Sequence, residues 1–242
     1  FTIQTNSLAN TAMRNLNNTE ERMTSVVQKL ATGSRIVRAA DDPAGLAISD
    51  QMNATIRSMN QAQRNAQDAV SLIQVFEGGT TEISNMLIRI RELSIQASSD
   101  TVGERERAML NLEVQELKSE ITRVARTTTY MDRELLAGEE VRLEFQVGTN
   151  NDASKDRILF DPGNTNLTSG GLSVDGIDVA NKLNAQGGLE SIDKAIVQVN
   201  ELRAKIGSTQ NRLQTTINTQ GIYVENLANA KSRIRDADMA AE

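Results

Sequence analysis

The chain has 242 residues, a net charge of −6, and neither cysteine nor histidine. Without these residue types the chain has no thiol nucleophile, no disulfide, no imidazole base and none of the best zinc ligands. We therefore expect that the protein is not an enzyme and binds no metal or cofactor. The negative charge argues against nucleic-acid binding, which needs basic patches. The sequence contains no apolar run of about 18 residues, so we expect no membrane-spanning segment.

The first predicted element is a helix with one thin apolar stripe. Apolar residues recur at helical spacing from Ala9 to Leu30, and Gly33 stands where a helix would end. Such a helix is only marginally stable alone, so it needs a partner. Residues 34–40 show no clear period, and we interpret them as a linker or spoke.

Asp42 and Pro43 predict the start of the next helix. Aspartate is a preferred N-cap residue, and proline is favoured at the first helical position. An alternative is that Asp41 and Asp42 are catalytic or metal-binding carboxylates, which the local sequence favours less than capping.

The stretch from Ile48 to Ala97 is the element around which the rest of the chain is organised. Its small or apolar residues recur at alternating spacings of four and three over about seven heptads, which is typical of a seam buried against other helices. Gly78 and Gly79 interrupt the pattern as a kink or as a point of close packing inside one helix. The predicted seam consists of Ile48, Met52, Thr55, Met59, Ala62, Ala66, Ala69, Ile73, Phe76, Thr80, Ile83, Leu87, Ile90, Ser94 and Ala97.

A shorter helix is predicted after a break at residues 98–100. Thr101 and Glu104 have the spacing of a capping box, with Thr101 as the N-cap. The seam then repeats over residues 110–124. Because the connection is short, we expect the two helices to be antiparallel neighbours.

The pattern changes to that of β structure after this helix. Residues 141–147 alternate apolar and polar side chains, as a half-buried strand does. We expect residues 130–137 to be the partner strand, with the turn at 137–140.

The rest of this non-helical region is predicted to be mostly loop. Residues 150–188, including Gly187 and Gly188, are rich in glycine, asparagine, aspartate and serine. Residues 158–160 and 172–174 are the further candidates for short strands.

From Leu189 to Ile234 the helical period returns and gives a second rod with a matching seam. We therefore predict a mainly α fold, an elongated antiparallel bundle of long coiled-coil-like helices with a small β-hairpin region at one end. The predicted parts are an N-terminal assembly helix and spoke linker (1–40), core helices (41–129), a β-hairpin and loop-rich insertion (130–188), and a long C-terminal core helix that returns to the assembly end (189–242).

Several short motifs, in a fixed order along nearly the whole chain, resemble those of the bacterial flagellins. Each is weak alone, but the set is highly specific. They are LATGSRI (30–36), ADDPAGLAI (40–48), QAQRNA (61–66), RIRELSIQA (89–97), LRAKIG (202–207), QNR (210–212) and SRIRDAD (232–238).

The resemblance implies a role and a set of partners. The role is self-assembly into the helical filament of the flagellum for motility. It further implies export through the flagellar type III apparatus, hence a secreted, extracellular protein, with a secretion chaperone and a filament cap protein as partners.

Two departures from the family pattern concern the extent of the chain. Family members usually continue with a further helix after Ala237 and Asp238, whereas this chain stops at Glu242, so we expect the C-terminal assembly helix to be missing. Residues 148–188 are too few to hold the outer domains of large flagellins, so we expect a minimal, core-only member.

A second implied partner is the innate-immune Toll-like receptor that detects flagellin. On spacing alone, the charges near Arg89 are an ordinary solvated face with intrahelical pairs. In many flagellins, however, the positions that match Arg89, Leu93 and Glu113 contact the receptor. The surface expected for receptor recognition and lateral packing comprises Arg89, Arg91, Glu92, Leu93, Glu113, Gln210 and Arg212.

The stripe of the first helix is the candidate polymerisation surface. With no partner in the chain, it must either remain disordered or be buried between chains, unless the helix folds back onto its own bundle. The residues assigned to polymerisation are Met13, Leu16, Met23, Val27, Leu30, Arg35 and Ile36.

Two alternatives to a filament subunit share the helical scheme. A hook–filament junction protein would have a low copy number and would not form long filaments alone. Another secreted coiled-coil protein of a type III system would lack the ADDPAGLA motif.

Overall fold

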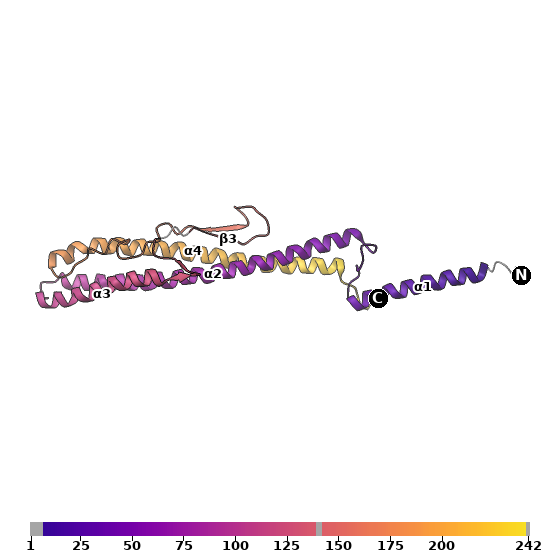
Figure 1. The fold of residues 1–242 in the computed structure, drawn as a ribbon, viewed down its shortest axis with the longest axis horizontal. Helices are drawn as coiled ribbons and strands as arrows, with labels where there is room; N and C mark the ends of the chain where they lie inside the picture. Colours follow the sequence, from indigo (N-terminus) through magenta and orange to yellow (C-terminus); the bar gives the residue numbers. More distant parts are fainter. Residues whose placement is uncertain (1–6, 139–141, 241–242) are drawn as a thin grey trace. The chain divides into compact units, whose positions relative to one another are not determined.

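The computed structural model describes residues 7–138 and 142–240. The chain forms two compact units, one of residues 1–61 and 220–242 and the other of residues 62–219. The elements are helices α1 (Ser7–Thr32), α2 (Pro43–Ala97), α3 (Glu104–Thr127) and α4 (Lys182–Arg235), with strands β1 (Thr129–Tyr130), β2 (Arg133–Glu134), β3 (Leu143–Gln146) and β4 (Arg157–Phe160) (Figure 1).

The second unit is a bundle of α2, α3 and α4, which confirms the predicted mainly helical, antiparallel fold. Arg91 of α2 lies 2.7 Å from Asp193 of α4, and Asp100, just after the end of α2, lies 2.7 Å from Lys182 of α4. Since α2 advances while α4 goes back, the two helices are antiparallel. Figure 1 shows α3 beside α2 in this unit.

The predicted seam of α2 is buried throughout this unit. Every seam residue from Ala62 to Ala97 is buried, and Ile83, Leu87 and Ile90 are fully so. The facing side of α4 supplies matching buried residues, namely Ile192, Val199, Leu202, Ile206 and Leu213.

Gly79 is a point of close packing, because α2 continues through both glycines. A Cβ atom on Gly79 would lie 2.7 Å from the Leu136 side chain and 2.7 Å from the Thr128 hydroxyl, whereas one on Gly78 would meet nothing within 4 Å. The missing side chain therefore lets the segment after α3 pack directly on α2.

The first hairpin pairs β1 with β2 in antiparallel register, Tyr130 opposite Arg133. The two residues of its turn, Met131 and Asp132, have φ values of 47° and 63°. Positive φ at both central positions is typical of a two-residue hairpin turn.

The predicted partner of the β3 strand was wrong. β3 pairs with β4, with Leu143 opposite Phe160 and Gln146 opposite Arg157, and not with residues 130–137. β4 confirms the strand candidate at 158–160. The predicted turn at 137–140 and Val141 lie partly outside the described residues.

Both β-hairpins lie toward the end of the second unit that contains its first residues. The Asn65 side chain, near the start of this unit in α2, donates to the Gln146 carbonyl at 3.2 Å. The ring of Phe160 packs edge-on against Phe76 of α2, with centroids 5.4 Å apart. The other end is closed by Arg107, which donates to the Ala97 carbonyl at 2.9 Å.

Two expectations for the loop-rich region were wrong. Residues 172–174 form a turn, with Ser173 at φ 56°, although Leu172 and Val174 are buried. Gly187 and Gly188 lie inside α4, which begins at Lys182 rather than at Leu189. The helical register that places Ala185 in the core extends α4 back through both glycines.

A buried lysine holds this loop to α3. Lys118 is 6% exposed, and its ammonium group donates to the carbonyls of Asp175 and Ile177, the latter at 3.1 Å. These bonds satisfy a charge that would otherwise be costly to bury.

The helix starts were predicted with mixed success. Asp42 caps α2, since its carboxylate accepts from the Gly45 amide at 2.9 Å and Pro43 is the first helical residue. The capping box at Thr101 was wrong. Gly103 is the N-cap of α3, and the Thr101 hydroxyl lies 2.7 Å from that of Ser99 instead.

The first unit contains α1 and the ends of α2 and α4. Gly33, with φ 65°, ends α1 as predicted. Ser34 and Asp236 then form an isolated antiparallel bridge, and Asp50 of α2 lies 3.1 Å from Arg235 of α4. The predicted spoke thus begins with a short backbone connection to the end of α4.

Candidate interaction surfaces

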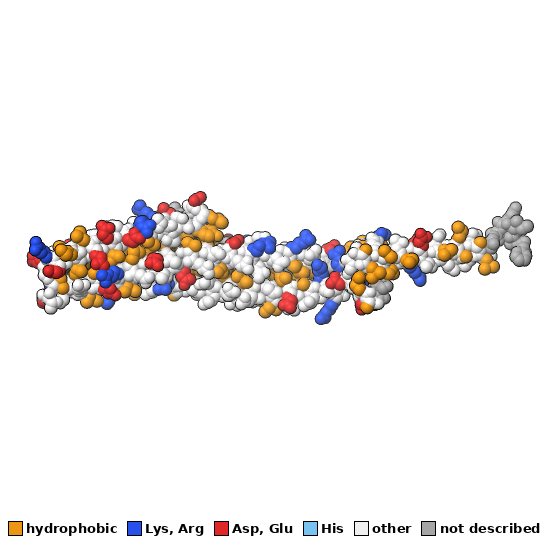
Figure 2. All heavy atoms as spheres, turned by 90° about the horizontal axis from the view of Figure 1, so that it is seen from below, with side chains coloured by type: hydrophobic (Ala, Val, Ile, Leu, Met, Phe, Trp, Pro, Cys, Tyr) orange, Lys and Arg blue, Asp and Glu red, His pale blue; other side chains and the backbone are white. Residues whose placement is uncertain are grey.

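The apolar stripe of α1 faces solvent. None of the described residues of α1 is buried, and Leu8, Met13, Leu16, Met23 and Val27 are more than half exposed. Figure 2 shows apolar side chains along this helix. The exposed stripe comprises Met13, Leu16, Met23 and Val27, while Leu30 is half-buried.

The last two residues assigned to polymerisation lie elsewhere. The amide of Arg35 donates to the Arg235 carbonyl at 2.6 Å, and its guanidinium donates to the Ile234 carbonyl at 2.7 Å. Ile36 is 2% exposed, and a Cβ atom on Gly45 would come within 2.8 Å of its side chain. Arg35 therefore closes the carboxyl end of α4, and Ile36 packs on the first turn of α2.

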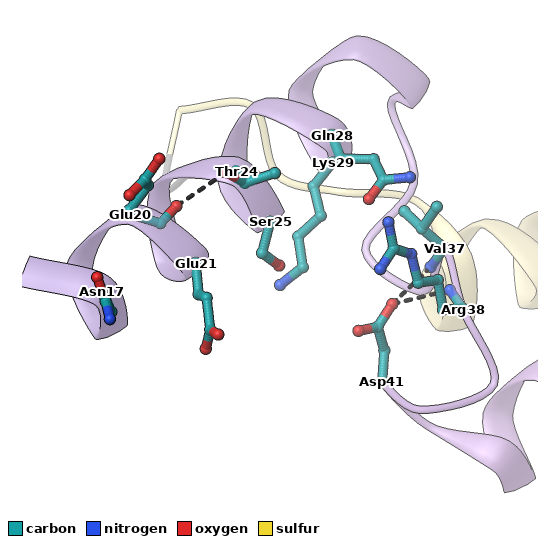
Figure 3. Close-up of a pocket in the computed structure, with 10 residues that line it drawn as sticks. All are labelled: Asn17, Glu20, Glu21, Thr24, Ser25, Gln28, Lys29, Val37, Arg38 and Asp41. Carbon is teal, nitrogen blue, oxygen red and sulfur yellow. Dashed lines mark hydrogen bonds between the residues drawn. The ribbon is translucent and has the colours of Figure 1, made fainter. Parts of the chain in front are cut away.

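The polar side of α1 and residues 37–41 line an open groove of about 610 Å³ (Figure 3). Glu20 and Glu21 lie toward one end of it, and Lys29 and Arg38 toward the other. The amides of Arg38 and Val37 donate to the Asp41 carboxylate and hold its pKa below the usual range. The carboxylate thus serves the turn before α2 rather than a catalytic centre.

A charged face lies on α2 in the second unit. Arg89 donates to Glu113 at 2.9 Å and to Glu92 at 3.1 Å, and these two carboxylates raise its pKa, Glu113 the more. Arg91 lies on another side of α2, where it donates to Asp193 of α4, which raises the pKa of Arg91. All of these side chains are well exposed, so the ion pairs are accessible.

Leu93 does not belong to this face. It is 1% exposed and lies in the core, so the expectation of a surface leucine was wrong. The burial of Leu93 follows from bundle geometry. A helix that packs on two neighbouring helices buries a wider stripe than the narrow seam with alternating spacings of four and three. Leu93 stands directly beside the seam residue Ser94.

Gln210 and Arg212 are not brought near Arg89. Both lie on α4, 17 and 19 residues beyond Asp193, which marks the level of Arg91. At 1.5 Å per helical residue this is about 25 Å or more along the bundle.

Several exposed apolar residues of the second unit were not singled out by the seam. Met109 and Leu112 on α3 are 70% and 68% exposed, and Ile88 and Ile95 on α2 are 45% and 49% exposed. A large apolar residue on the polar side of an amphipathic helix was the available signal.

Neither a metal site nor a membrane-spanning helix is found among residues 7–138 and 142–240. These residues contain no cluster of three or more acidic side chains placed to hold a metal ion. No helix among them combines the length and apolar character needed to cross a bilayer.

Two family models match most of the chain. Residues 3–140 match the bacterial flagellin N-terminal helical region, and residues 189–242 match the bacterial flagellin C-terminal helical region. The expectation that the C-terminal helix is missing was therefore wrong, since the second match covers α4 from Leu189 onward.

Individual proteins agree with the family match. A flagellin of Halalkalibacterium halodurans is 42% identical over 94% of this chain and 81% of its own length. The crystal structure of Bacillus cereus flagellin is similar with a TM-score of 0.57 at 29% identity, over 65% of this chain and 88% of that one. A flagellar hook-associated protein of Vibrio parahaemolyticus shares the fold, with a TM-score of 0.65 at 13% identity, over 81% of this chain and 100% of that one.

Proposed function

We propose that the α1 stripe is the polymerisation surface of this chain, which belongs to the bacterial flagellins, the structural, non-enzymatic subunits of the extracellular flagellar filament. The observation that carries the proposal is the exposure of Met13, Leu16, Met23 and Val27 on one helix face. Burying each such side chain contributes about 1.5–3 kcal/mol. A helix with an apolar stripe of this kind is typically bound in a groove of a partner.

The test places a charge on the stripe. Leu16→Asp and Met23→Asp should leave the monomer folded and equally stable, because neither side chain is buried. Both variants should fail to form filaments by electron microscopy and sedimentation. The control is Asn18→Asp, an exposed α1 position off the stripe, which should assemble normally. Normal filaments from Leu16→Asp would refute the proposal.

We also propose a role for each part of the chain. Residues 1–40 form the assembly helix and spoke, residues 41–129 and 189–242 the helical core, and residues 130–188 a small insertion. Only residues 141–188 separate the two family matches, which supports a core-only member.

The charged face on α2 is a second candidate surface, for recognition by the Toll-like receptor of flagellin. Arg89, Glu92 and Glu113 form an exposed, ordered charge cluster, which supports it. Arg89→Ala should lower signalling in a receptor reporter assay. Arg123→Ala, which removes another exposed arginine that pairs with Glu120, should not. Equal signalling from Arg89→Ala and the unaltered protein would count against the proposal.

Family membership further supports export by the flagellar type III apparatus, with a secretion chaperone and a filament cap protein as partners. Binding of the purified chain to each can be measured by calorimetry. The structural similarity to a hook-associated protein concerns the fold alone. A junction protein would not form long filaments by itself, so polymerisation of the purified chain separates the two roles.

A further inference from the structure

All the sulfur of this chain is in methionine. The sequence has eight methionines and no cysteine, so every sulfur atom is a thioether, which a two-electron oxidant converts into a sulfoxide. None of the eight is buried. Five are exposed and three are half-buried, and the exposed ones are Met13, Met23, Met109, Met131 and Met239.

Two of the exposed methionines stand on the α1 stripe. Met23 lies seven residues after Leu16 and four residues before Val27, and these spacings place all three on one side of the helix. Met13 lies three residues before Leu16, one turn earlier on that side. An open hollow of about 460 Å³ is lined by Met13, Leu16 and Met23 among others. We define the stripe sulfurs as those of Met13 and Met23.

Both side chains meet water in the single chain. Met13 and Met23 are 67% and 68% exposed, and none of the described residues of α1 is buried. A dissolved oxidant therefore reaches them, and a sulfoxide oxygen formed there stays hydrated. Oxidation should thus leave the helix and the stability of the monomer unchanged.

The cost of the sulfoxide appears when the stripe is covered. Oxidation turns a flexible apolar side chain into a polar one. A polar oxygen that leaves water for an apolar contact costs free energy unless a hydrogen-bond donor meets it. Because Met23 has Leu16 and Val27 on its side of the helix, an oxygen there would enter the middle of the apolar stripe.

We propose that Met13 and Met23 are a reversible oxidation site, and that their conversion to sulfoxide keeps the unassembled subunit out of the filament. The reagent is a two-electron oxidant of the peroxide or hypohalous acid class. With hydrogen peroxide, the thioether sulfur takes one oxygen atom, the O–O bond breaks, and the other oxygen leaves as water. This inference rests on the proposed role of the α1 stripe in polymerisation.

The reverse step restores the apolar stripe. A methionine sulfoxide reductase removes the oxygen as water and returns the thioether, while a dithiol that serves as electron donor becomes a disulfide. Assembly has the opposite effect, since a covered stripe is closed to the oxidant. Met23 should therefore oxidise at least about tenfold more slowly in the filament than in the free subunit, if its cover opens as rarely as a buried contact does.

The first experiment compares the untreated and the oxidised subunit. The purified full chain is treated with hydrogen peroxide, and the sulfoxide at each methionine is quantified by peptide mass spectrometry. Circular dichroism of the monomer should not change. The critical concentration for filament formation, measured by sedimentation and electron microscopy, should rise about tenfold or more. Treatment with methionine sulfoxide reductase and dithiothreitol should restore it.

Two matched variants locate the effect. Met13→Leu/Met23→Leu keeps the stripe apolar at similar volume and removes its sulfurs, so it should assemble equally before and after peroxide. Met109→Leu/Met131→Leu/Met239→Leu removes the other exposed methionines and keeps the stripe sulfurs, so peroxide should still block its assembly.

A third variant reproduces the polar change without any oxidant. Met23→Gln places an amide on the stripe, so it should raise the critical concentration while circular dichroism of the monomer stays the same. Unchanged assembly of Met23→Gln would count against the inference.

The outcomes separate this inference from the role of α1. Normal filaments from a subunit in which Met13 and Met23 are fully oxidised would overturn the oxidation site. An equal loss of assembly in Met13→Leu/Met23→Leu after peroxide would also overturn it, because the damage would then lie at another methionine. In both cases the failure of Leu16→Asp to assemble would leave the α1 proposal standing, whereas normal filaments from Leu16→Asp would refute both proposals.

Discussion

The two parts of α2 carry the same sequence pattern and have different surroundings. From Ala62 to Ala97 every seam residue is buried, whereas Ile48 is 50% exposed and Met52 and Met59 are only half-buried. The alternating spacing of four and three is equally regular in both parts. A seam therefore shows which face of a helix needs cover, and it does not show whether the same chain provides the cover.

The same distinction extends to α1, whose stripe is the most exposed of all. In the second unit, α3, α4 and the hairpins cover the seam, and its stability is a property of one chain. In the first unit the apolar stripe of α1 remains open to solvent, and we propose that other copies cover it in the filament. The contrast between the two regions is the structural basis of the assembly proposal.

The largest expected effect comes from truncating an isoleucine in the covered part of the seam, compared with one in its exposed part. Ile83→Ala should lower the free energy of unfolding by about 2–5 kcal/mol, because Ile83 is fully buried. Ile48→Ala should change it by less than about 0.5 kcal/mol. Denaturant unfolding of the monomer, followed by circular dichroism, measures both. Equal losses would break the comparison.

The next effect concerns the buried lysine that ties the insertion to α3. Lys118→Met should cost about 1–3 kcal/mol, because the carbonyls of Asp175 and Ile177 lose their donor. Hydrogen exchange should rise in residues 168–179. Lys194→Met, at an exposed position, is the control and should change neither quantity. Unchanged exchange in Lys118→Met would show that apolar packing alone holds the loop.

The adjacent glycines of α2 test the close packing at the hairpin end. Gly79→Ala should destabilise the fold by about 1–3 kcal/mol, because its methyl group would overlap Leu136 and Thr128. Gly78→Ala meets open space and should stabilise by about 0.5–1 kcal/mol through helix propensity. Thermal unfolding of the two variants should therefore shift in opposite directions. A shift of both in the same direction would contradict the packing described.

The smallest effect is that of an exposed ion pair. The hydrogen bond from Lys182 lowers the pKa of Asp100 below its ordinary value of 3.8. A carboxylate with a lowered folded-state pKa stabilises the fold above its unfolded pKa and loses this contribution as the pH falls through the folded value. Asp100→Asn should thus be slightly less stable than the unaltered protein near pH 6, and the difference should vanish at about pH 2. A difference that grows on acidification would have the wrong sign.

Local sequence patterns predicted the features that depend on neighbouring residues along the chain. The seam from Ala62 to Ala97, the cap at Asp42, the end of α1 at Gly33 and the strand at 158–160 each follow from spacing or from one residue type. The family motifs predicted the architecture and the role, because their order along the chain is specific.

The features that were missed depend on contacts distant in sequence. The alternation of residues 141–147 predicts a strand but cannot select its partner, which is β4. The burial of Leu93 requires a third helix beside the seam, and that of Lys118 requires carbonyls from residues 175 and 177. At Thr101 a local pattern was present, but its hydroxyl pairs with Ser99 and leaves Gly103 to begin α3.

The most direct test asks whether the α1 stripe changes from water to a protein interior on assembly. Met23→Cys introduces the single cysteine of the chain, which is labelled with an environment-sensitive fluorophore, and Asn18→Cys serves as the matched position off the stripe. Our account predicts a solvent-like spectrum at both positions in the monomer and a strong blue shift at position 23 alone in the filament. A blue shift at position 23 already in the monomer, or none in the filament, would contradict it.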